Sequence, residues 1–398
     1  MVIRRLILIS VAAVACSTAA CGGSETTNAN TGSGGTKPIV IGAAVAESGG
    51  FELFDSNLLA GIRHGIEKVN AAGGVNGRRL ELIVADHRSD PALIQSATQE
   101  VLDKGADVVV TSVGYDLGGP AALAARRAGK LSISGGSATE FGMKGLGPLF
   151  FNVNQGTPTE SIAMAQLAYT TQNLRHPYLL EDTTLQYTKS LCGEFEKAWA
   201  KLAGPGTIAG RDTFKNDDPS IAGQVSRLKS AGQADFLVLC SYQPGGASAL
   251  RQIRGAGVTL PIYGGAGFDG TFWTKTVPDL SNFYHAAMVS SAGDDPNPAI
   301  NQFLASVKFS GGPVFVVWGE LVIETLSKGI QRAGTTDGPA LAKAIESFRD
   351  EPLLVGPTSY SATCHTPIDR PMAMLKIEHG KASFIEYVTP TGVPDTAC

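Results

Sequence analysis

Two glycine-containing segments of the chain carry the hydroxyl and backbone groups that bind a small anion. One is Gly114-Tyr115-Asp116 and the other is Gly135-Gly136-Ser137-Ala138-Thr139. A carboxylate is held well by hydroxyls and by backbone N–H groups, especially where a helix begins. Glycine lets a backbone come close to a ligand, and Ser137 or Thr139 has a hydroxyl to donate. The two segments therefore predict a site for a small polar solute, unless both are plain turns at strand ends.

A strand, a helix and a second strand precede these segments and help to position them. Residues 39–45 and 79–86 have the apolar, β-branched composition of strands, and residues 57–72 are predicted to form a helix between them. The apolar stripe of that helix consists of Leu58, Ile62, Ile66 and Val69. Parallel strands joined by a crossover helix form a cleft at their carboxyl ends, and small molecules bind there.

The same alternation continues through most of the chain. Residues 106–113 form an almost wholly apolar run, as expected for an inner strand, and a loop is predicted at 114–119. Pro120 suits the first turn of the next helix, predicted at 120–128. A second run of helices and strands follows and includes a predicted short strand at 207–209. Two successive runs of this kind predict an α/β fold with two Rossmann-like lobes, each with a parallel central sheet.

The start of the chain has the features of an export signal. Arg4 and Arg5 form a basic start, and residues 6–15 are mainly apolar. Small residues then precede Cys21-Gly-Gly-Ser, which resembles a bacterial lipoprotein signal. We therefore expect a signal peptide at 1–20 and lipidation of Cys21, with Cys16 as a weaker candidate. An ordinary cleaved signal peptide is the alternative.

The composition after Cys21 bears on where the protein acts. Residues 21–37 are rich in Gly, Ser, Thr and Asn and are expected to form a flexible tether. No later run reaches the roughly 18 apolar residues that span a bilayer. We predict a domain exported and lipid-anchored to the outer face of the cell membrane. Without residues 1–20 the chain has 30 basic and 36 acidic residues, a formal charge of −6, which argues against a nucleic-acid partner.

Four further cysteines follow the predicted anchor: Cys192, Cys240, Cys364 and Cys398. An even number of cysteines in an exported chain predicts two disulfides. Of the three possible pairings we favour Cys192 with Cys240, inside one lobe, and Cys364 with Cys398, which holds the C-terminal end. Free buried thiols are the alternative.

The sequence offers little for an enzyme or a metalloprotein. It has no GxSxG or HExxH motif, no CxxC pair and no zinc-like spacing of His and Cys. Residues 265–270 match GxGxxG, but His285 lies about 20 residues on, where a dinucleotide fold needs an acid. We predict a protein with no catalytic activity, metal or cofactor.

Several segments together carry the pattern of one protein family. The most specific is GIRHGIEKVNAAGGVNG at 61–77, and the others are specific through their order: 39–42, Asp86, 90–91, 133–139, 182–187, 250–252 and 355–357. Over residues 38–388 the chain resembles the leucine/isoleucine/valine-binding proteins of bacterial ABC importers, which have the type I periplasmic-binding fold. The resemblance implies two lobes joined by three hinge crossovers, with the ligand in the cleft between the lobes. Its implied boundaries are 38–156 and 288–365 for lobe 1, 157–287 and 366–398 for lobe 2, and crossovers near Gly156, Ser290 and Ile368.

The resemblance also implies which residues contact the ligand. The segments 114–116 and 135–139 would hold its main-chain groups, although Tyr115 stands where the family usually has a serine. From lobe 2, Tyr187 and Tyr242, or Gln243 beside it, match tyrosines that close over the ligand. Phe54 lies near a family aromatic that lines the pocket, and Trp273 is a second candidate. Either aromatic is equally consistent with the core.

The partner of a ligand ammonium group is the main departure from the family. The glutamate that the family uses corresponds to Ala266 here. Asp269, three residues on, or Asp116 can take its place. If neither reaches the cleft, the ligand lacks an ammonium group and is an amide, a urea-like compound or an organic acid.

These observations imply a function as well as a fold. We expect a monomeric receptor for a small polar solute, most simply a branched-chain or other neutral amino acid, that works by hinge closure. Its implied partners are an ABC permease and its ATPase subunits. A ligand sensor with the same fold is the alternative.

Overall fold

The computed structural model describes residues 37–394 and 398, and the statements below concern those residues. The predicted signal peptide, Cys21 and almost all of the predicted tether lie outside them. Within them, no helix is both long enough and apolar enough to cross a membrane.

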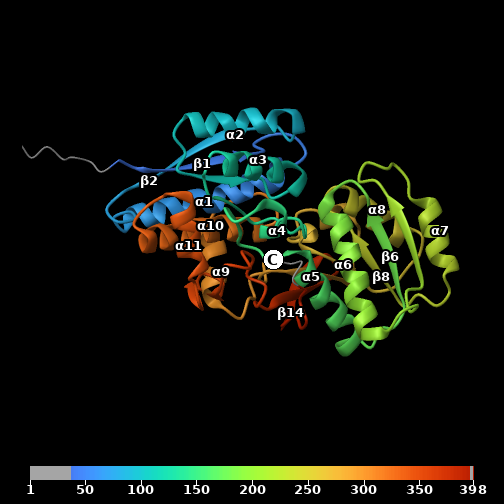
Figure 1. Ribbon diagram of the computed structural model, residues 1–398. Coiled ribbons are helices and arrows are strands. Elements are labelled where there is room, and N and C mark those ends of the chain that lie inside the picture. The colour runs from blue at the N-terminus through green and yellow to red at the C-terminus, as the bar shows by residue number, and fades with distance from the viewer. Residues whose placement is uncertain (1–36, 395–397) are drawn as a thin grey trace, which may run out of the picture. The chain divides into compact units, whose positions relative to one another are not determined.

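Lobe 1 is built on a five-stranded, wholly parallel sheet with the order β2-β1-β3-β4-β5. The strands are β1 (Ile39–Val45), β2 (Leu80–Asp86), β3 (Val108–Thr111), β4 (Ser132–Ser134) and β5 (Phe150–Asn152). Helices α2 (Ile94–Asp103) and α3 (Tyr115–Arg127) cover one face, and α1 (Glu52–Ala71) and α10 (Pro313–Ala333) cover the other (Figure 1). Every residue of β1 is buried, as expected for a central strand covered on both faces.

Lobe 2 is built on a seven-stranded sheet with the order β14-β13-β10-β9-β8-β6-β7. Strands β6 (Pro177–Asp182), β7 (Gly210–Phe214), β8 (Phe236–Cys240), β9 (Ile262–Gly264) and β10 (Phe283–Ala287) are parallel, and β13 (Met372–Glu378) and β14 (Lys381–Val388) add an antiparallel hairpin. Helices α5 (Gly156–Gln166) and α6 (Gln186–Ala203) pack together, as do α7 (Ala222–Ser230) and α8 (Gly245–Gly255). The strand predicted at 207–209 is wrong by three residues, because β7 starts at Gly210.

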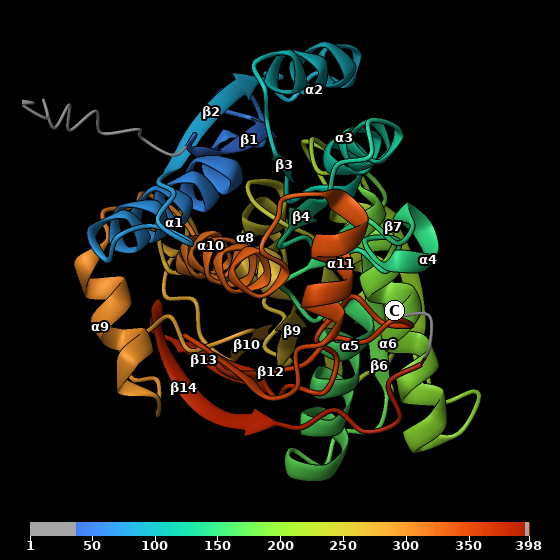
Figure 2. The same ribbon diagram turned by 60° about the vertical axis from the view of Figure 1, so that its left-hand side comes forward.

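The chain passes between the two sheets three times: after β5, after β10 and before β13. Between the second and third passages it forms α9 (Pro298–Ser306), α10, α11 (Gly338–Glu346) and a small hairpin of β11 (Glu351–Leu353) and β12 (Gly356–Thr358) (Figure 2). The predicted α/β fold with two lobes and three crossovers is therefore confirmed.

Two disulfides cross-link parts of this fold. Cys192 in α6 is bonded to Cys240 at the end of β8, and Cys364 is bonded to Cys398. These are the pairings that the sequence favoured. The carbonyl oxygen of Cys398 also accepts a hydrogen bond of 2.7 Å from the backbone N–H of Met143, so the C-terminal residue is held against lobe 1.

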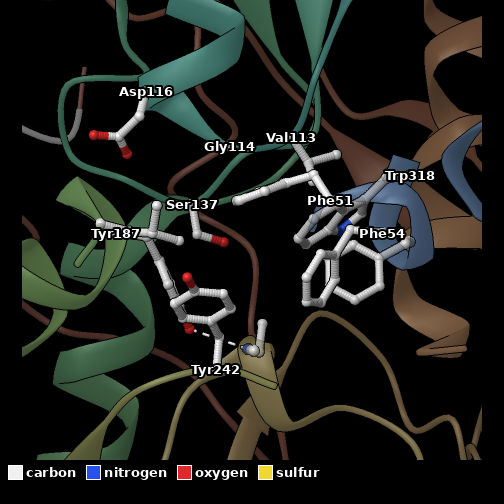
Figure 3. A pocket seen from close by; sticks show the side chains of 13 residues that line it. Phe51, Phe54, Val113, Gly114, Asp116, Ser137, Tyr187, Tyr242 and Trp318 are labelled. Carbon is white, nitrogen blue, oxygen red and sulfur yellow. Dashed lines mark hydrogen bonds between the residues drawn. The ribbon is translucent and has the colours of Figure 1, made fainter. Parts of the chain in front are cut away.

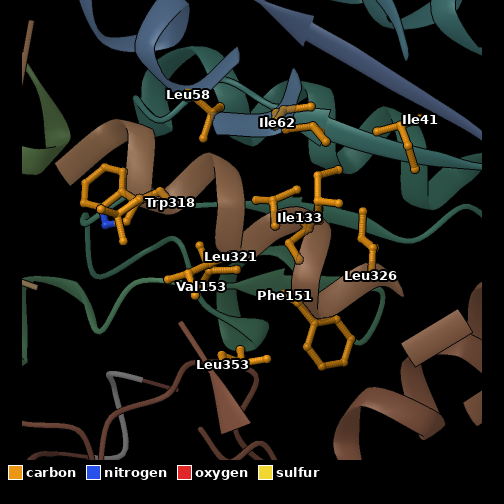
Figure 4. Packing of buried hydrophobic residues seen from close by; sticks show 14 of the residues in the cluster. Ile41, Leu58, Ile62, Ile133, Phe151, Val153, Trp318, Leu321, Leu326 and Leu353 are labelled. Atoms are coloured by element: carbon orange, nitrogen blue, oxygen red, sulfur yellow. The ribbon is translucent and has the colours of Figure 1, made fainter. Parts of the chain in front are cut away.

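The core of lobe 1 depends on close packing between α1 and α10 (Figure 4). A Cβ atom at Gly61 would clash with the carbonyl oxygen of Val316, and one at Gly319 would clash with that of Leu58. The two glycines let the helix backbones touch, which brings Leu58 and Leu321 into one buried cluster. Phe54 belongs to the same helix and the same cluster, so the packing of α1 on α10 also fixes the position of Phe54.

We expect Gly319→Ala to lower the free energy of unfolding by about 2 kcal/mol, because α1 and α10 must separate to admit the methyl group. Gly193→Ala in α6 is the matched control, since a Cβ atom there meets nothing within 4 Å; it should raise the stability by up to about 1 kcal/mol. Urea unfolding followed by circular dichroism measures both. Equal effects of the two substitutions would contradict the proposed role of Gly319.

Candidate ligand-binding site

A small cavity of about 50 Å³ lies where the two lobes meet (Figure 3). Lobe 1, including α10, supplies one wall. Lobe 2 supplies the other, from the starts of α6 and α8 and from the turn after β9. The lining residues are Phe51, Phe54, Val113, Gly114, Asp116, Ser137, Leu185, Tyr187, Tyr242, Ala266, Gly267, Phe315 and Trp318. Five of the ten ligand-binding residues expected from the sequence line this cavity, namely Phe54, Asp116, Ser137, Tyr187 and Tyr242. The lining is mainly apolar and consists largely of aromatic rings.

Four aromatic side chains form the lobe 1 wall. The ring centroids are 5.4 Å apart for Phe51 and Phe54, 5.1 Å for Phe54 and Phe315, and 4.8 Å for Phe315 and Trp318. The last two pairs meet edge to face, the geometry that aromatic quadrupoles favour. Gly114 is required beside this wall, because a Cβ atom there would overlap the ring of Phe51. The wall suits an apolar or aromatic part of a solute.

The prediction of a loop at 114–119 is wrong, because α3 already begins at Tyr115. A Cβ atom at Gly118 would clash with the carbonyl oxygen of Ser112, so glycine allows this early turn to pack directly on the end of β3. The ring of Tyr115 packs edge to face on Phe141, with centroids 5.6 Å apart, and does not line the cavity. Asp116 lines it from the first helical turn.

The carboxylate of Asp116 is already engaged across the cleft. It accepts a hydrogen bond of 3.1 Å from the backbone N–H of Gln186, the first residue of α6. In Figure 3 the carboxylate is turned away from the rings of Phe51, Phe54 and Trp318. Asp116 thus links the two lobes at the start of α6, where the helix dipole favours a negative charge.

The segment after β4 contributes one side chain to the cavity, that of Ser137. Its hydroxyl oxygen accepts a hydrogen bond of 2.6 Å from the side-chain amide of Asn154. The other three predicted members do not line the cavity: Gly136 packs against Phe141, Ala138 is buried, and the Thr139 hydroxyl lies 2.9 Å from that of Thr157.

Tyr187 and Tyr242 both line the cavity from lobe 2. The Tyr242 ring reaches across the cleft, with its centroid 6.2 Å from those of Phe51 and Phe54. The Tyr187 hydroxyl donates to the carboxylate of Glu160 at 3.2 Å and accepts from the backbone N–H of Gly267 at 3.1 Å. Burial, followed by the charge of Glu160, raises the pKa of Tyr187 well above its usual value, so this phenol stays protonated.

Glu160 is the residue that the sequence analysis missed. It is fully buried in α5, and its Oε2 atom also accepts from the backbone N–H of Ala266 at 3.2 Å. Burial raises the pKa of its carboxyl group, an effect that hydrogen bonds from Ser137, Ala266 and Tyr187 partly offset. Three of its hydrogen-bond partners, Ser137, Tyr187 and Ala266, line the cavity. Glu160 therefore holds these three residues in place from behind the cavity wall. Its only sequence signal is an acid within the apolar helix that follows the first crossover.

The structure does not bring Asp269 to the cavity. This residue is 1% exposed, and its carboxylate accepts from the Ser291 hydroxyl at 2.6 Å and from the backbone N–H of Val314 at 2.8 Å. The second bond satisfies an N–H group at the start of α10, a frequent use of an acidic side chain. Phe54 does line the cavity, whereas Trp273 lines a neighbouring one and its indole N–H donates to the carbonyl oxygen of Phe268 at 3.1 Å.

A buried acid, Asp55, holds the two strand ends next to the cavity. Its carboxylate accepts from the backbone N–H of Ala46 at 2.8 Å and from that of Val113 at 3.0 Å. Burial raises its pKa to about 6, with the two backbone hydrogen bonds acting in the opposite direction. The folded state therefore binds this proton more tightly than the unfolded state.

Because the pKa of Asp55 is raised on folding, its contribution to stability is complete below about pH 4 and is lost as the pH rises through about 6. We expect the free energy of unfolding of wild type to fall relative to that of Asp55→Asn by about 2 kcal/mol between pH 4 and 7. Urea unfolding at several pH values measures the difference. Asp86→Asn is the control of opposite sign: burial acts to raise the pKa of Asp86, but hydrogen bonds from Ser48, Arg88 and Glu47 outweigh burial and lower it. If the free energy of unfolding depends on pH in the same way for wild type and Asp55→Asn, the raised pKa of Asp55 is contradicted.

Metal-ligating side chains do not gather at this site. Among residues 37–394 and 398, no group of three or more His, Cys, Asp or Glu residues is placed to hold a metal ion.

Residues 38–382 match the model of a family described as periplasmic binding protein. A Leu/Ile/Val-binding protein homolog 3 of Brucella melitensis is 25% identical over 330 residues, which cover 82% of this chain and 88% of that protein.

Solved structures share the fold at lower identity. A leucine-binding protein, LivK, of Thermotoga maritima has a TM-score of 0.77 and 20% identity, and the match covers 88% of this chain and 99% of that one. A solute-binding protein of an R. palustris ABC transporter, solved in complex with benzoate, has a TM-score of 0.74 and 18% identity, with coverage of 91% and 99%. The type I periplasmic-binding fold and the resemblance to Leu/Ile/Val-binding proteins are confirmed, and the chain belongs to the periplasmic binding protein family.

Proposed function

We propose that this protein is an extracytoplasmic receptor that binds a branched-chain or other neutral amino acid in the cavity between its lobes and delivers it to an ABC importer. One observation carries the proposal: the cavity is closed by aromatic rings from one lobe and by Tyr187, Tyr242 and a backbone turn from the other. A solute that touches both walls stabilises the closed arrangement over any open one. The family membership of the chain supports the same function.

The cavity provides distinct surroundings for the parts of an amino acid. The wall of Phe54, Phe315 and Trp318 suits an apolar side chain. The start of α3 after Gly114 offers backbone N–H groups for a carboxylate. Asp116 lines the cavity, whereas Glu160 lies behind it and is bonded to three lining residues; in this proposal the charge of Glu160 takes the part that was expected of Asp269.

The proposal extends to the parts of the chain outside the cavity. Lobe 1 comprises 38–156 and 288–365 and lobe 2 comprises 157–287 and 366–398, so that the chain crosses at hinges between them. Lipidation of Cys21 and the tether to residue 37 hold the domain at the outer face of the membrane, beside its permease and ATPase subunits. Loss of solute uptake by cells that lack the protein would separate transport from a sensing role.

A second candidate ligand is an organic acid without an ammonium group. Among the described residues, Asp116 is the one acid that lines the cavity, and it is hydrogen-bonded to Gln186. Ala266 stands where the family has a glutamate. The benzoate complex of the R. palustris protein shows that this fold holds such an acid.

Calorimetric titration of residues 37–398 with L-leucine and with 4-methylpentanoate, which lacks only the amino group, distinguishes the two candidates. Tighter binding of leucine by at least about tenfold is expected, since the charge-assisted bonds of an ammonium group are worth roughly 1.5–3 kcal/mol. Glu160→Gln should reduce this ratio. Tighter binding of 4-methylpentanoate would favour the organic acid, and binding of neither compound would contradict the proposal.

A further inference from the structure

The start of α6 in lobe 2 is bound by two acidic side chains of lobe 1. Gln186, the first residue of this helix, donates its backbone N–H to the carboxylate of Asp116 at 3.1 Å. Its side-chain amide donates from Nε2 to Oε1 of Glu140 at 2.8 Å. Asp116 lies in the first turn of α3, and Glu140 directly follows the segment 135–139. One residue of lobe 2 is therefore bound by carboxylates from two separate segments of lobe 1.

A further contact joins the same two surfaces one helical turn later. The hydroxyl oxygen of Ser190 accepts a hydrogen bond of 3.4 Å from the backbone N–H of Thr139, which precedes Glu140. Residues four apart lie on one face of a helix, so Gln186 and Ser190 present the same face of α6 to lobe 1. Tyr187, which follows Gln186, lines the cavity. The contact of α6 with lobe 1 therefore determines how close Tyr187 comes to the aromatic wall.

The bonds to Gln186 have the chemistry of strong hydrogen bonds. N–H groups at the start of a helix lack partners within the helix and carry partial positive charge, and Asp116 satisfies one of them. A bond to a carboxylate is stronger than a bond between neutral groups. Glu140 depends on Gln186, because its other oxygen, Oε2, is buried and has no hydrogen-bond partner among the described residues. Donors and acceptors lie on different lobes, so separation of the lobes breaks both bonds.

We propose that Gln186, Asp116 and Glu140 form a latch that holds the two lobes closed over a bound solute. The inference rests on the proposed function, because closure around a solute is the mechanism of that function. Neither Gln186 nor Glu140 lines the cavity, so both are positioning residues. A contact that exists only in the closed form adds to affinity by slowing the escape of the solute, not by speeding its entry.

Stopped-flow measurement of L-leucine binding to residues 37–398 tests the latch. Gln186→Ala removes the side-chain bond to Glu140 and should raise the dissociation rate constant about tenfold, with the association rate constant within about twofold of wild type. Gln99→Ala is the matched control, because Nε2 of Gln99 donates to Oδ1 of Asp103 at 2.7 Å within α2 and joins no two lobes. Its rate constants should equal those of wild type. An unchanged dissociation rate constant in Gln186→Ala would overturn the latch.

Gln186→Lys provides a readout that a purely structural role would not change. Its ammonium group would pair with Glu140 across the lobe boundary. At low ionic strength, leucine should dissociate from Gln186→Lys about threefold more slowly than from the Gln186→Lys, Glu140→Gln double variant. Salt screens a partly exposed ion pair, so this difference should shrink at high ionic strength. Equal rates in the two variants at low ionic strength would overturn the latch.

Small-angle X-ray scattering without any solute separates this inference from the proposed function. If the latch favours the closed form, the radius of gyration of Gln186→Ala should exceed that of Gln186→Lys at low ionic strength. Equal radii would overturn the latch, whether or not leucine binds. If leucine binds to wild type with rate constants that Gln186→Ala does not alter, the latch is wrong and the receptor function stands. If the radii differ as expected but no amino acid binds, the latch stands and the proposed ligand is wrong.

Discussion

Replacing Tyr187 by alanine is expected to weaken solute binding by about 100-fold, because the ring covers the cavity from lobe 2 and a buried tyrosine of this kind is worth more than about 2 kcal/mol. The substitution also removes the acceptor of the Gly267 N–H and a donor to Glu160. Tyr187→Phe keeps the ring and loses only the hydroxyl, so its effect should be about tenfold. Isothermal titration with the highest-affinity amino acid measures all three proteins.

Tyr115→Ala is the matched control for this series. The sequence pointed to both Tyr115 and Tyr187, but the structure turns Tyr115 onto Phe141, whereas Tyr187 lines the cavity. We expect the affinity of Tyr115→Ala to stay within about threefold of wild type. Comparable losses at Tyr115 and Tyr187 would mean that the binding site is not the cavity described above.

Removing the disulfide between Cys192 and Cys240 should lower the free energy of unfolding by about 4 kcal/mol. The bond closes a separation of 48 residues, and loop entropy alone accounts for that magnitude. Both cysteines are fully buried between α6 and β8, so the replacement is best made with alanine. Urea unfolding of the Cys192→Ala, Cys240→Ala double variant measures the loss.

The second disulfide provides a comparison within the same chain. It closes a separation of 34 residues and ends at the C-terminal residue. The Cys364→Ala, Cys398→Ala variant should lose less, because Cys364 is only partly buried and its removal leaves no comparable core cavity. A loss below about 1 kcal/mol for the Cys192–Cys240 pair would contradict its stabilising role.

Much of the fold could be predicted because buried parallel strands leave a plain signal. Strand β1 has the bounds that the sequence indicated, 39–45, since all seven of its residues are apolar or small and buried. Helix starts were less predictable. Helix α1 begins at Glu52, five residues before the prediction, and α3 begins at Tyr115 because Gly118 packs on Ser112. Such tertiary contacts are not visible in local sequence.

The site was predicted less completely, for a related reason. Ser137, Tyr187, Tyr242, Phe54 and Asp116 all line the cavity. Asp269 was chosen for its nearness to Ala266 in the sequence, yet its carboxylate meets the start of α10, which begins 44 residues later. Glu160 lies 106 residues before Ala266 and still accepts its backbone N–H. Both outcomes depend on how distant segments meet.

The central claim is that a small amino acid binds in the cavity beside Trp318. The chain has three tryptophans, and a Trp199→Phe, Trp273→Phe variant leaves Trp318 as the only indole. The measurement is a fluorescence titration of that variant with L-leucine and other neutral amino acids. The proposed function predicts a saturable change in Trp318 emission, with a midpoint equal to the dissociation constant from calorimetry. Binding by calorimetry without any change in Trp318 emission would contradict it.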